Sequence, residues 1–306
     1  MKESAQKHIV DLFARTNHLE RKNIPVKVMG VIAHAAAPFY LFVECLAPSG
    51  LPDSPNPIDG LLITLVKRMF DVVSGTVSLL VLGRPQQAEI LSRTVMESAL
   101  SLLYLAKADS GARLIQYFEH YIAQEREQNR KWQRELTALA DERRADHNAR
   151  ISDKNEALDN MALFLERFAQ TVGVKYPSER GYPNFLGICT ALGKAIDYRT
   201  VYMAMCSQAH HDAEDILNDL IVGLAPNQEK QSAQLERETN NFSIFLVLHS
   251  IRYYLECLGS IGERYKFTSV EHQSSKSSSA VSTLLVEVSS GGFVSNPLYG
   301  WVPGEI

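Results

Sequence analysis

The chain has 306 residues, a formal net charge of −4, 45% hydrophobic residues and 22% charged residues. This composition is typical of a soluble globular protein and excludes a disordered or fibrous chain. The length allows one large domain or two modest ones. The slightly acidic balance argues against a nucleic-acid binder that depends on overall positive charge, although it leaves room for a local basic patch.

Cysteine usage indicates a reducing compartment. The four cysteines are far apart in the chain, with neither a CxxC pair nor a zinc-finger spacing: Cys45, Cys189, Cys206 and Cys257. Four cysteines in a chain of this length do not make the disulfide framework of a small secreted domain. The first residues run straight into an amphipathic pattern without the apolar core of a signal peptide. We therefore expect a cytoplasmic protein.

Two apolar stretches raise the question of a membrane. The stretch 61–82 contains Lys67, Arg68 and Asp71, which are costly at the centre of a bilayer. The stretch 28–47 is just long enough to span and has Pro38 near its middle. We interpret it as a buried core helix bent at this proline, because large helical cores also contain helices that are apolar all round. The sequence gives no other indication of a membrane partner.

Helical periodicity dominates the chain. The spacing predicts helices over 4–22, 26–46, 59–82, 86–108, 111–149, 153–172, 184–195, 197–222 and 232–264. Four prolines make a loop of 47–57, and the helix 197–222 has a candidate break near His211. We expect three parts: N-terminal helices and a Pro-rich loop at 1–57, a main helical domain at 58–265, and a tail at 266–306.

The long helix 111–149 changes character along its length. From Glu125 to Arg150, thirteen of 26 residues are Asp, Glu, Lys or Arg, of both signs. Such a mixture is typical of a solvated helix with pairs at i,i+4. Ser152-Asp153 has the residue types that cap a return helix. These patterns predict an antiparallel hairpin at about 120–172 that protrudes from the body or contacts another protein, such as a second copy of this chain.

The end of the chain differs in composition from the rest. Between Ser274 and Ser282, six of nine residues are serine, which is a signal for a flexible linker. The segment 283–288 has the pattern of a strand, with Gly291-Gly292 as a turn. The predicted fold is therefore all-α: a multi-helix bundle with a protruding charged hairpin and a short irregular or β-like C-terminal tail.

Polar residues stand on two otherwise apolar helices, where burial is costly unless they pair. Arg93 and Glu97 are spaced i,i+4 on the first helix. On the second, about 100° per residue places one stripe on a single face: Arg199, Tyr202, Cys206 and His210. Ser207 lies one turn from both His210 and His211. Each stripe needs the other to avoid an unpaired buried charge, so we expect the two helices to pack against each other and form one pocket, with Arg93 near His210. Such a cluster can hold an anion or perform acid–base chemistry, or it can be a buried network that fixes helix register.

These residues resemble a known family. The segment 88–98, with its Arg93-x-x-x-Glu97 pattern, is similar to a helix of the bacterial family catalogued as domain of unknown function 5677. The likeness continues at 198–202 and 206–210, and it covers roughly residues 60–260. It implies a helical domain of unsettled activity with a signature site of Arg93, Glu97, Tyr198, Tyr202, Ser207 and His210. His211 departs from the family pattern, which has a small residue there.

More loosely, the helical pattern resembles HEPN-type nuclease and defence domains. Those use an arginine followed after four to six residues by a histidine to cleave RNA without metal. The segment from Arg113 to His120 has this spacing, but Leu114 stands where those proteins place a polar residue. Such a spacing also arises by chance in a chain of this composition, so we do not take it as the site. Arg199 and His210, eleven residues apart, share a face but not the pattern.

Other types of site have less support. The run His210-His211-Asp212, with Glu214 and Asp215, lacks two histidines at the i,i+4 spacing of metal ligands. Ser207 with His210 lacks the nucleophile elbow of a hydrolase. No Gly-rich dinucleotide motif or P-loop occurs. We therefore expect neither a metal nor a cofactor.

Two functions remain open from the sequence. The first is a HEPN-like, metal-independent protein that cleaves or binds RNA in bacterial stress or anti-phage defence. Its candidate catalytic residues are Arg93, Glu97, Ser207 and His210, and its candidate substrate-binding residues are Tyr198, Arg199, Tyr202 and His211. The second is a non-enzymatic helical interaction or ligand-sensing module, in which the same polar cluster is structural.

Overall fold

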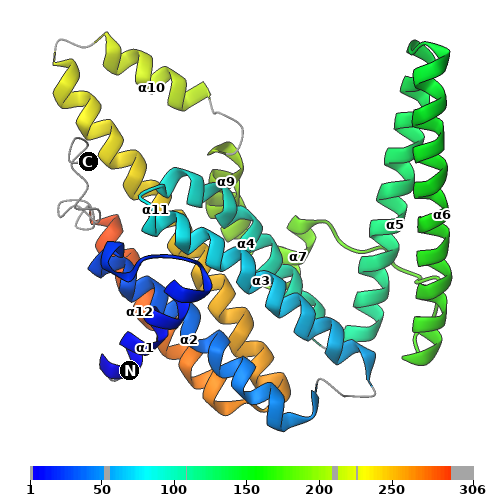
Figure 1. Ribbon diagram of the computed structural model, residues 1–306, viewed down its shortest axis with the longest axis horizontal. Helices are drawn as coiled ribbons and strands as arrows, with labels where there is room; N and C mark the ends of the chain where they lie inside the picture. Colours follow the sequence, from blue (N-terminus) through cyan, green and yellow to red (C-terminus); the bar gives the residue numbers. More distant parts are fainter. Residues whose placement is uncertain (1–2, 52–55, 108, 209–212, 225–226, 291–306) are drawn as a thin grey trace. The chain divides into compact units, whose positions relative to one another are not determined.

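The computed structural model describes residues 3–51, 56–107, 109–208, 213–224 and 227–290 (Figure 1). Within these ranges most residues are helical and none is in a strand, which confirms the predicted all-α class. The chain divides into two compact units. Unit 1 comprises Met1–Asp53, Leu62–Ala106 and Phe185–Ile306, and unit 2 comprises Ser54–Leu61 and Lys107–Asn184.

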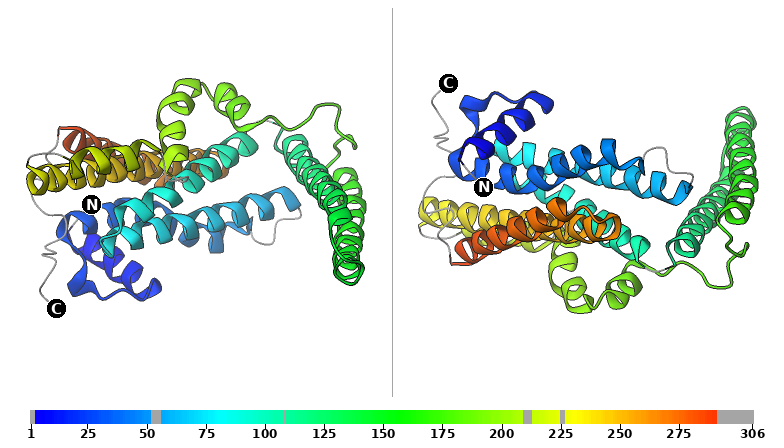
Figure 2. Two further views of the ribbon diagram at one scale, coloured as in Figure 1. Left: turned by 90° about the horizontal axis from the view of Figure 1, so that it is seen from above. Right: turned by 90° about the horizontal axis from the view of Figure 1, so that it is seen from below.

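Unit 1 is built around the long helix α11 (Gln228–Tyr265), which packs against α4 (Pro85–Ala106) and α12 (Thr268–Ser289). Helix α2 (Val26–Ser49) packs against α12 and α1 (Glu3–Thr16), as two further views show (Figure 2). The remaining elements of this unit are most of α3 (Pro57–Val81), α7 (Phe185–Ala191), α8 (Ala195–Asp197), the π-helical turn η4 (Tyr198–Tyr202), α9 (Met203–Gln208) and α10 (Ala213–Gly223).

The burial of α11 follows its sequence. Its first three turns are polar and exposed, whereas Leu248, Ile251 and Leu258 in its second half are fully buried. Tyr254 is also fully buried, and its hydroxyl donates a 3.1 Å hydrogen bond to the carbonyl of Ala35 in α2. This bond satisfies the one polar atom of the side chain. The second half of α11 is therefore the centre of the core.

Two described helices, α2 and α11, are long and apolar enough to cross a membrane by length and composition alone. Half of the apolar window in α2 and 67% of that in α11 are buried within the protein. Core helices of globular proteins meet the same criterion. The burial of Ile32 and Phe42 supports the interpretation of α2 as a core helix, and Pro38 lies inside it.

The predicted linker and strand near the C-terminus are wrong. Residues 268–289 form helix α12, which packs along α11 and α2. The serines that suggest a linker by composition are small side chains at a helix contact: Ser274 and Ser277 are 2% and 0% exposed. A Cβ at Gly259 of α11 would lie 3.5 Å from the Cβ of Ser274. These small residues let α11 and α12 approach closely. The rest of the predicted tail, residues 291–306, lies outside the described residues.

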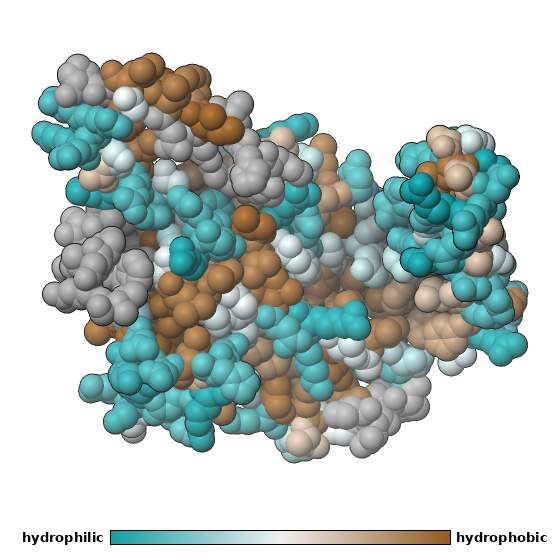
Figure 3. All heavy atoms as spheres, turned by 45° about the horizontal axis from the view of Figure 1, so that its top comes forward, coloured by the Kyte–Doolittle hydropathy of each residue, from teal (hydrophilic) through white to brown (hydrophobic). Residues whose placement is uncertain are grey.

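Helix α10 exposes much of its apolar face. More than half of the surface of each of four large side chains is accessible: Ile216, Leu217, Leu220 and Ile221. They form the brown patch at the top of the space-filling view (Figure 3). Contiguous apolar surface of this kind marks interaction sites in many proteins.

Unit 2 is a helical hairpin, as the sequence predicts. Helix α5 (Ser110–Glu135) and helix α6 (Asp141–Thr171) run antiparallel, joined by a 3₁₀ turn at Leu136–Ala138. The predicted position of the turn, at 150–152, is wrong. Arg144 donates from Nε and Nη2 to the carbonyl oxygens of Leu136 and Leu139, at 3.2 and 2.8 Å, and so closes the turn earlier.

Different interactions hold the two halves of the hairpin. Near its base, apolar side chains form a small core: Ile115, Ile122, Leu158, Leu165 and Phe168. Further out, Asn129 is 2% exposed and donates a 2.8 Å hydrogen bond to Asn155. Exposed ion pairs such as Arg126–Asp159 add little stability in water. The role of this hairpin as an oligomer or partner surface stays a prediction.

Candidate functional site

The first part of the site lies on α4. Val95, Met96 and Leu100 face the core and are fully buried. Arg93 and Glu97, on an adjacent face, keep 32% and 37% of their side-chain surface accessible. The Nε of Arg93 donates a 2.9 Å hydrogen bond to Oε1 of Glu97. The predicted i,i+4 pair therefore exists, and both side chains can be reached from solvent.

The second part lies on η4 and α9. The chain forms a π-helical turn at Tyr198–Tyr202, a conformation that is often found at functional sites. Val201 and Met205 anchor it in the core, at 8% and 0% exposure. The rings of Tyr198 and Tyr202 are stacked, with centroids 5.0 Å apart. The turn thus carries two stacked tyrosine rings, one nearly buried (Tyr202) and one half-buried (Tyr198).

Tyr202 joins the two parts. Its hydroxyl donates a 2.6 Å hydrogen bond to Oε1 of Glu97, and Cζ of Arg93 lies 5.4 Å from the centre of its ring. We call Arg93, Glu97 and Tyr202 the triad. The Arg93–Glu97 pair and the second polar stripe thus meet at Tyr202.

Electrostatics assigns the protons of the triad. The hydrogen bond to Glu97 raises the pKa of Arg93. Burial, followed by the hydrogen bond to Glu97, raises the pKa of Tyr202 above its usual range. Both groups therefore act as donors at neutral pH. Within the triad, Oε1 of Glu97 accepts both hydrogen bonds.

An aromatic cluster adjoins the triad. The ring of Phe185, at the start of α7, lies 4.5 Å from that of Tyr202 and 6.2 Å from that of Tyr198. We call these three rings the aromatic cluster. Cζ of Arg199, an exposed residue, lies 5.5 Å from the centre of the Tyr198 ring. Each tyrosine ring of the cluster therefore has a guanidinium group beside it, that of Arg93 at Tyr202 and that of Arg199 at Tyr198.

The structure brings together five of the eight predicted site residues: Arg93, Glu97, Tyr198, Arg199 and Tyr202. Ser207 belongs to α9, but its side chain is outside the described part of the chain. His210 and His211 also lie outside the described residues. The predicted proximity of His210 to Arg93 therefore stays a prediction.

The family whose description reads "Family of unknown function (DUF5677)" matches residues 59–228, more than half of the chain. The chain belongs to this family. No curated protein matches it, and no solved structure matches it. The matched range contains all eight predicted site residues, and it confirms the resemblance at family level. The looser resemblance to HEPN-type domains receives no support from these comparisons.

Within this member of the family, sequence reasoning missed two residues of the site region. Nothing in the sequence around Phe185, apart from its aromatic side chain, indicates that it belongs to the site. Glu89 does have a sequence signal, because it precedes Arg93 and Glu97 at i,i+4,i+8 spacing and so lies on the same face of α4. It is 1% exposed and accepts a 2.7 Å hydrogen bond from Oγ of Ser243 in α11.

A second polar cluster fixes the start of η4 to α11. Asp197, directly before Tyr198, shares a hydrogen bond with Tyr253, and Lys194 forms a 2.8 Å ion pair with Glu256. Burial, reinforced by the nearby Arg252, lowers the pKa of His249 to about 4. The π-helical turn that carries Tyr198 and Tyr202 is therefore also held by polar contacts to α11 at its start.

Among the described residues, no group of three or more His, Cys, Asp and Glu side chains is placed to hold a metal ion. The candidate group at 210–215 lies largely outside those residues.

Proposed function

We propose that the triad and the aromatic cluster form a binding site for single-stranded RNA, and that the protein cleaves this RNA without metal, as a HEPN-like enzyme of bacterial stress or anti-phage defence. The observation that carries the proposal is that two arginines adjoin the aromatic cluster, Arg93 at the ring of Tyr202 and Arg199 at the ring of Tyr198. Unstacked bases bind on aromatic side chains, and guanidinium groups bind phosphate.

The chemistry assigns a role to each group. Glu97 takes the proton of a ribose 2′-hydroxyl, whose oxygen then forms a bond to the adjacent phosphorus. Arg93 stabilises the negative charge that develops on the phosphate oxygens. The bond to the 5′-oxygen breaks, and this oxygen receives a proton from a general acid, for which His210 is the sequence candidate. The products are a 2′,3′-cyclic phosphate and a 5′-hydroxyl.

Cleavage of an end-labelled single-stranded RNA, with and without EDTA, tests this mechanism. We expect equal rates in both conditions and products ending in a cyclic phosphate. Glu97→Gln keeps the size of the side chain but removes the base, and we expect the rate to fall by about 10²–10⁴-fold. Glu127→Gln, at an exposed ion pair of the hairpin, is the matched control and should leave the rate unchanged. Intact RNA after incubation with wild-type protein would refute the nuclease.

RNA binding is tested separately by fluorescence anisotropy of a labelled single strand. Arg199 is exposed, so Arg199→Ala should leave the fold intact and weaken binding by roughly tenfold. The difference in affinity between the wild type and Arg199→Ala should be smaller at high salt, because a phosphate contact releases counterions and therefore weakens as the salt concentration rises. Equal affinity of wild type and Arg199→Ala at low salt would remove this residue from the site.

The alternative function, an interaction or ligand-sensing module with a structural polar network, is favoured by one observation. The members of the triad are already hydrogen-bonded to one another, because Oε1 of Glu97 accepts from both Arg93 and Tyr202. Tyr202 is also only 7% exposed. Fully satisfied networks of this kind rigidify a fold. If RNA is neither bound nor cleaved, and Glu97→Gln lowers the urea midpoint, the network is structural.

A further inference from the structure

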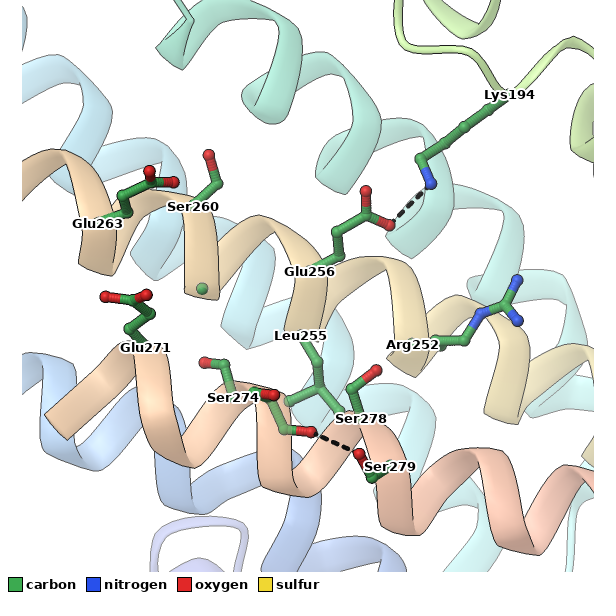
Figure 4. A pocket seen from close by; sticks show the side chains of 12 residues that line it. Lys194, Arg252, Leu255, Glu256, Ser260, Glu263, Glu271, Ser274, Ser278 and Ser279 are labelled. Atoms are coloured by element: carbon green, nitrogen blue, oxygen red, sulfur yellow. Dashed lines mark hydrogen bonds and ion pairs between the residues drawn. The ribbon is translucent and has the colours of Figure 1, made fainter. Parts of the chain in front are cut away.

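A polar groove runs between α11 and α12 in unit 1, with a volume of about 540 Å³ (Figure 4). Of the twelve residues that line it, all but Leu255 and Gly259 carry a polar side chain. Its volume lies within the range of roughly 300–1,000 Å³ that is usual for ligand sites. The groove shares no residue with the triad or the aromatic cluster.

The two ends of the groove carry opposite charges that the protein leaves unmatched. Glu263 of α11 and Glu271 of α12 lie at one end (Figure 4), and neither forms an ion pair with any described residue. Arg252 lies at the other end, beside the Lys194–Glu256 pair. Within the described ranges Arg252 has no carboxylate partner, and its Nη2 donates a long 3.5 Å hydrogen bond to the hydroxyl of Tyr253.

Serine hydroxyl groups line the groove between these ends. Other serines of α12 satisfy their hydroxyl locally, as Ser279 and Ser282 do by donating to the carbonyl four residues earlier. Ser274 does not: it is 2% exposed, lines the groove, and its Oγ has no hydrogen-bond partner in the described structure. A buried hydroxyl without a partner is costly, so a ligand that supplies one would gain from it.

The length of the groove limits the ligand. Arg252 and Glu263 are eleven residues apart on one face of α11, which corresponds to roughly 16 Å at a rise of about 1.5 Å per residue. An extended peptide covers about 3.3–3.6 Å per residue. Four or five residues of extended chain would therefore reach from one charged end to the other, and their amide groups would meet the serine hydroxyls on the way.

We propose that this groove binds a short extended peptide, with a free ammonium group at Glu263 and Glu271 and a carboxylate at Arg252. A polyamine would place a cation beside Arg252, and an anionic nucleotide would place phosphate beside the two glutamates. Both arrangements bring like charges together. A dipolar linear molecule matches both ends.

Calorimetric titration of the full-length protein with tetraglycine tests the proposal. We expect saturable binding, and we expect about tenfold weaker binding when the amino terminus of the peptide is acetylated or its carboxyl terminus is amidated, since each change removes one charged contact. The variant Glu263→Gln/Glu271→Gln should weaken binding of the free peptide by about as much as acetylation does. In this variant, acetylation should have little further effect, because the same contact is already lost.

The control is Glu229→Gln/Glu236→Gln, which makes the same change of charge on the exposed first turns of α11. It should bind like the wild type. Ser274→Ala gives a second readout: we expect weaker peptide binding without a lower melting temperature, whereas a purely structural serine would change the melting temperature alone.

Absence of binding at about 10 mM tetraglycine, a concentration that reveals even millimolar affinity, would overturn the proposal. Equal affinity for the free and the acetylated peptide would do the same. This second comparison uses only the wild-type protein, so it decides the question even if a glutamate variant fails to fold.

Discussion

Tyr202 and Glu97 stand 105 residues apart in the sequence, and a 2.6 Å hydrogen bond joins them. Because Tyr202 is nearly buried and its partner is a carboxylate, this bond is of the stronger class. It connects the π-helical turn with α4, and so it joins two of the segments that resemble the family, 88–98 and 198–202.

Removing this hydroxyl should destabilise the protein. We expect Tyr202→Phe to lower the free energy of unfolding by about 1.5–3 kcal/mol, because the carboxylate loses a donor in a half-buried site. Urea denaturation measures the change. Tyr121→Phe, at a tyrosine that is 46% exposed, is the control and should change stability by less than about 0.5 kcal/mol. Equal midpoints for the two variants would mean that the bond adds nothing to the fold.

The pH dependence of stability should report His249. The folded state lowers its pKa from 6.5 to about 4, so between these values the unfolded chain binds more protons than the folded one. Stability should therefore fall as the pH drops from about 6.5 towards 4. The contribution is at most roughly 3 kcal/mol, and less to the extent that the ring remains partly solvated.

Urea midpoints at pH 7 and pH 5 measure this effect. In His249→Phe, whose new ring keeps the packing against Phe245 and Tyr253, the loss between the two pH values should be smaller. His272→Asn, at an exposed histidine, should retain the wild-type loss. An unchanged pH dependence in His249→Phe would assign the effect to another group.

The close approach of α11 and α12 should make one glycine indispensable. A Cβ at Gly262 would meet the backbone nitrogen of Glu271 at 3.0 Å and the carbonyl oxygen of Phe267 at 3.3 Å. We expect Gly262→Ala to cost about 1–3 kcal/mol, because these backbone atoms have to move. Gly30→Ala, in α2 with nothing within 4 Å, should instead gain about 0.5–1 kcal/mol. Thermal melts of both variants would show opposite shifts.

The outer part of the hairpin should be dispensable for folding. The small core at its base lies outside residues 128–150, so replacement of these residues by a short Gly-Ser loop should leave a cooperatively unfolding protein. If the hairpin is an interaction surface, the same deletion should lower the oligomeric state measured by light scattering. A non-cooperative melt would place part of the essential core in the deleted segment.

The sequence predicts most helices because their buried faces repeat with helical spacing. It also predicts the meeting of α4 and the 198–211 segment, since polar residues on apolar helices need one another. Other features depend on partners that a local pattern does not reveal. Ser274 and Ser277 resemble a linker until α11 is seen to lie against them. The turn at 136–140 depends on Arg144 reaching back to two carbonyl groups, and Phe185 becomes part of the site only through contacts with Tyr198 and Tyr202.

The bond between Tyr254 and Ala35 has a consequence for synthesis on the ribosome. It spans 219 residues, which take roughly 10–40 s to translate at about 5–20 residues per second. Unit 2 is complete by Asn184 and can fold during this interval, whereas the buried face of α2 has to wait for α11 to emerge. The nascent chain therefore carries α2 without its neighbours α11 and α12 until these helices emerge, and this is the period in which a chaperone would have most to bind.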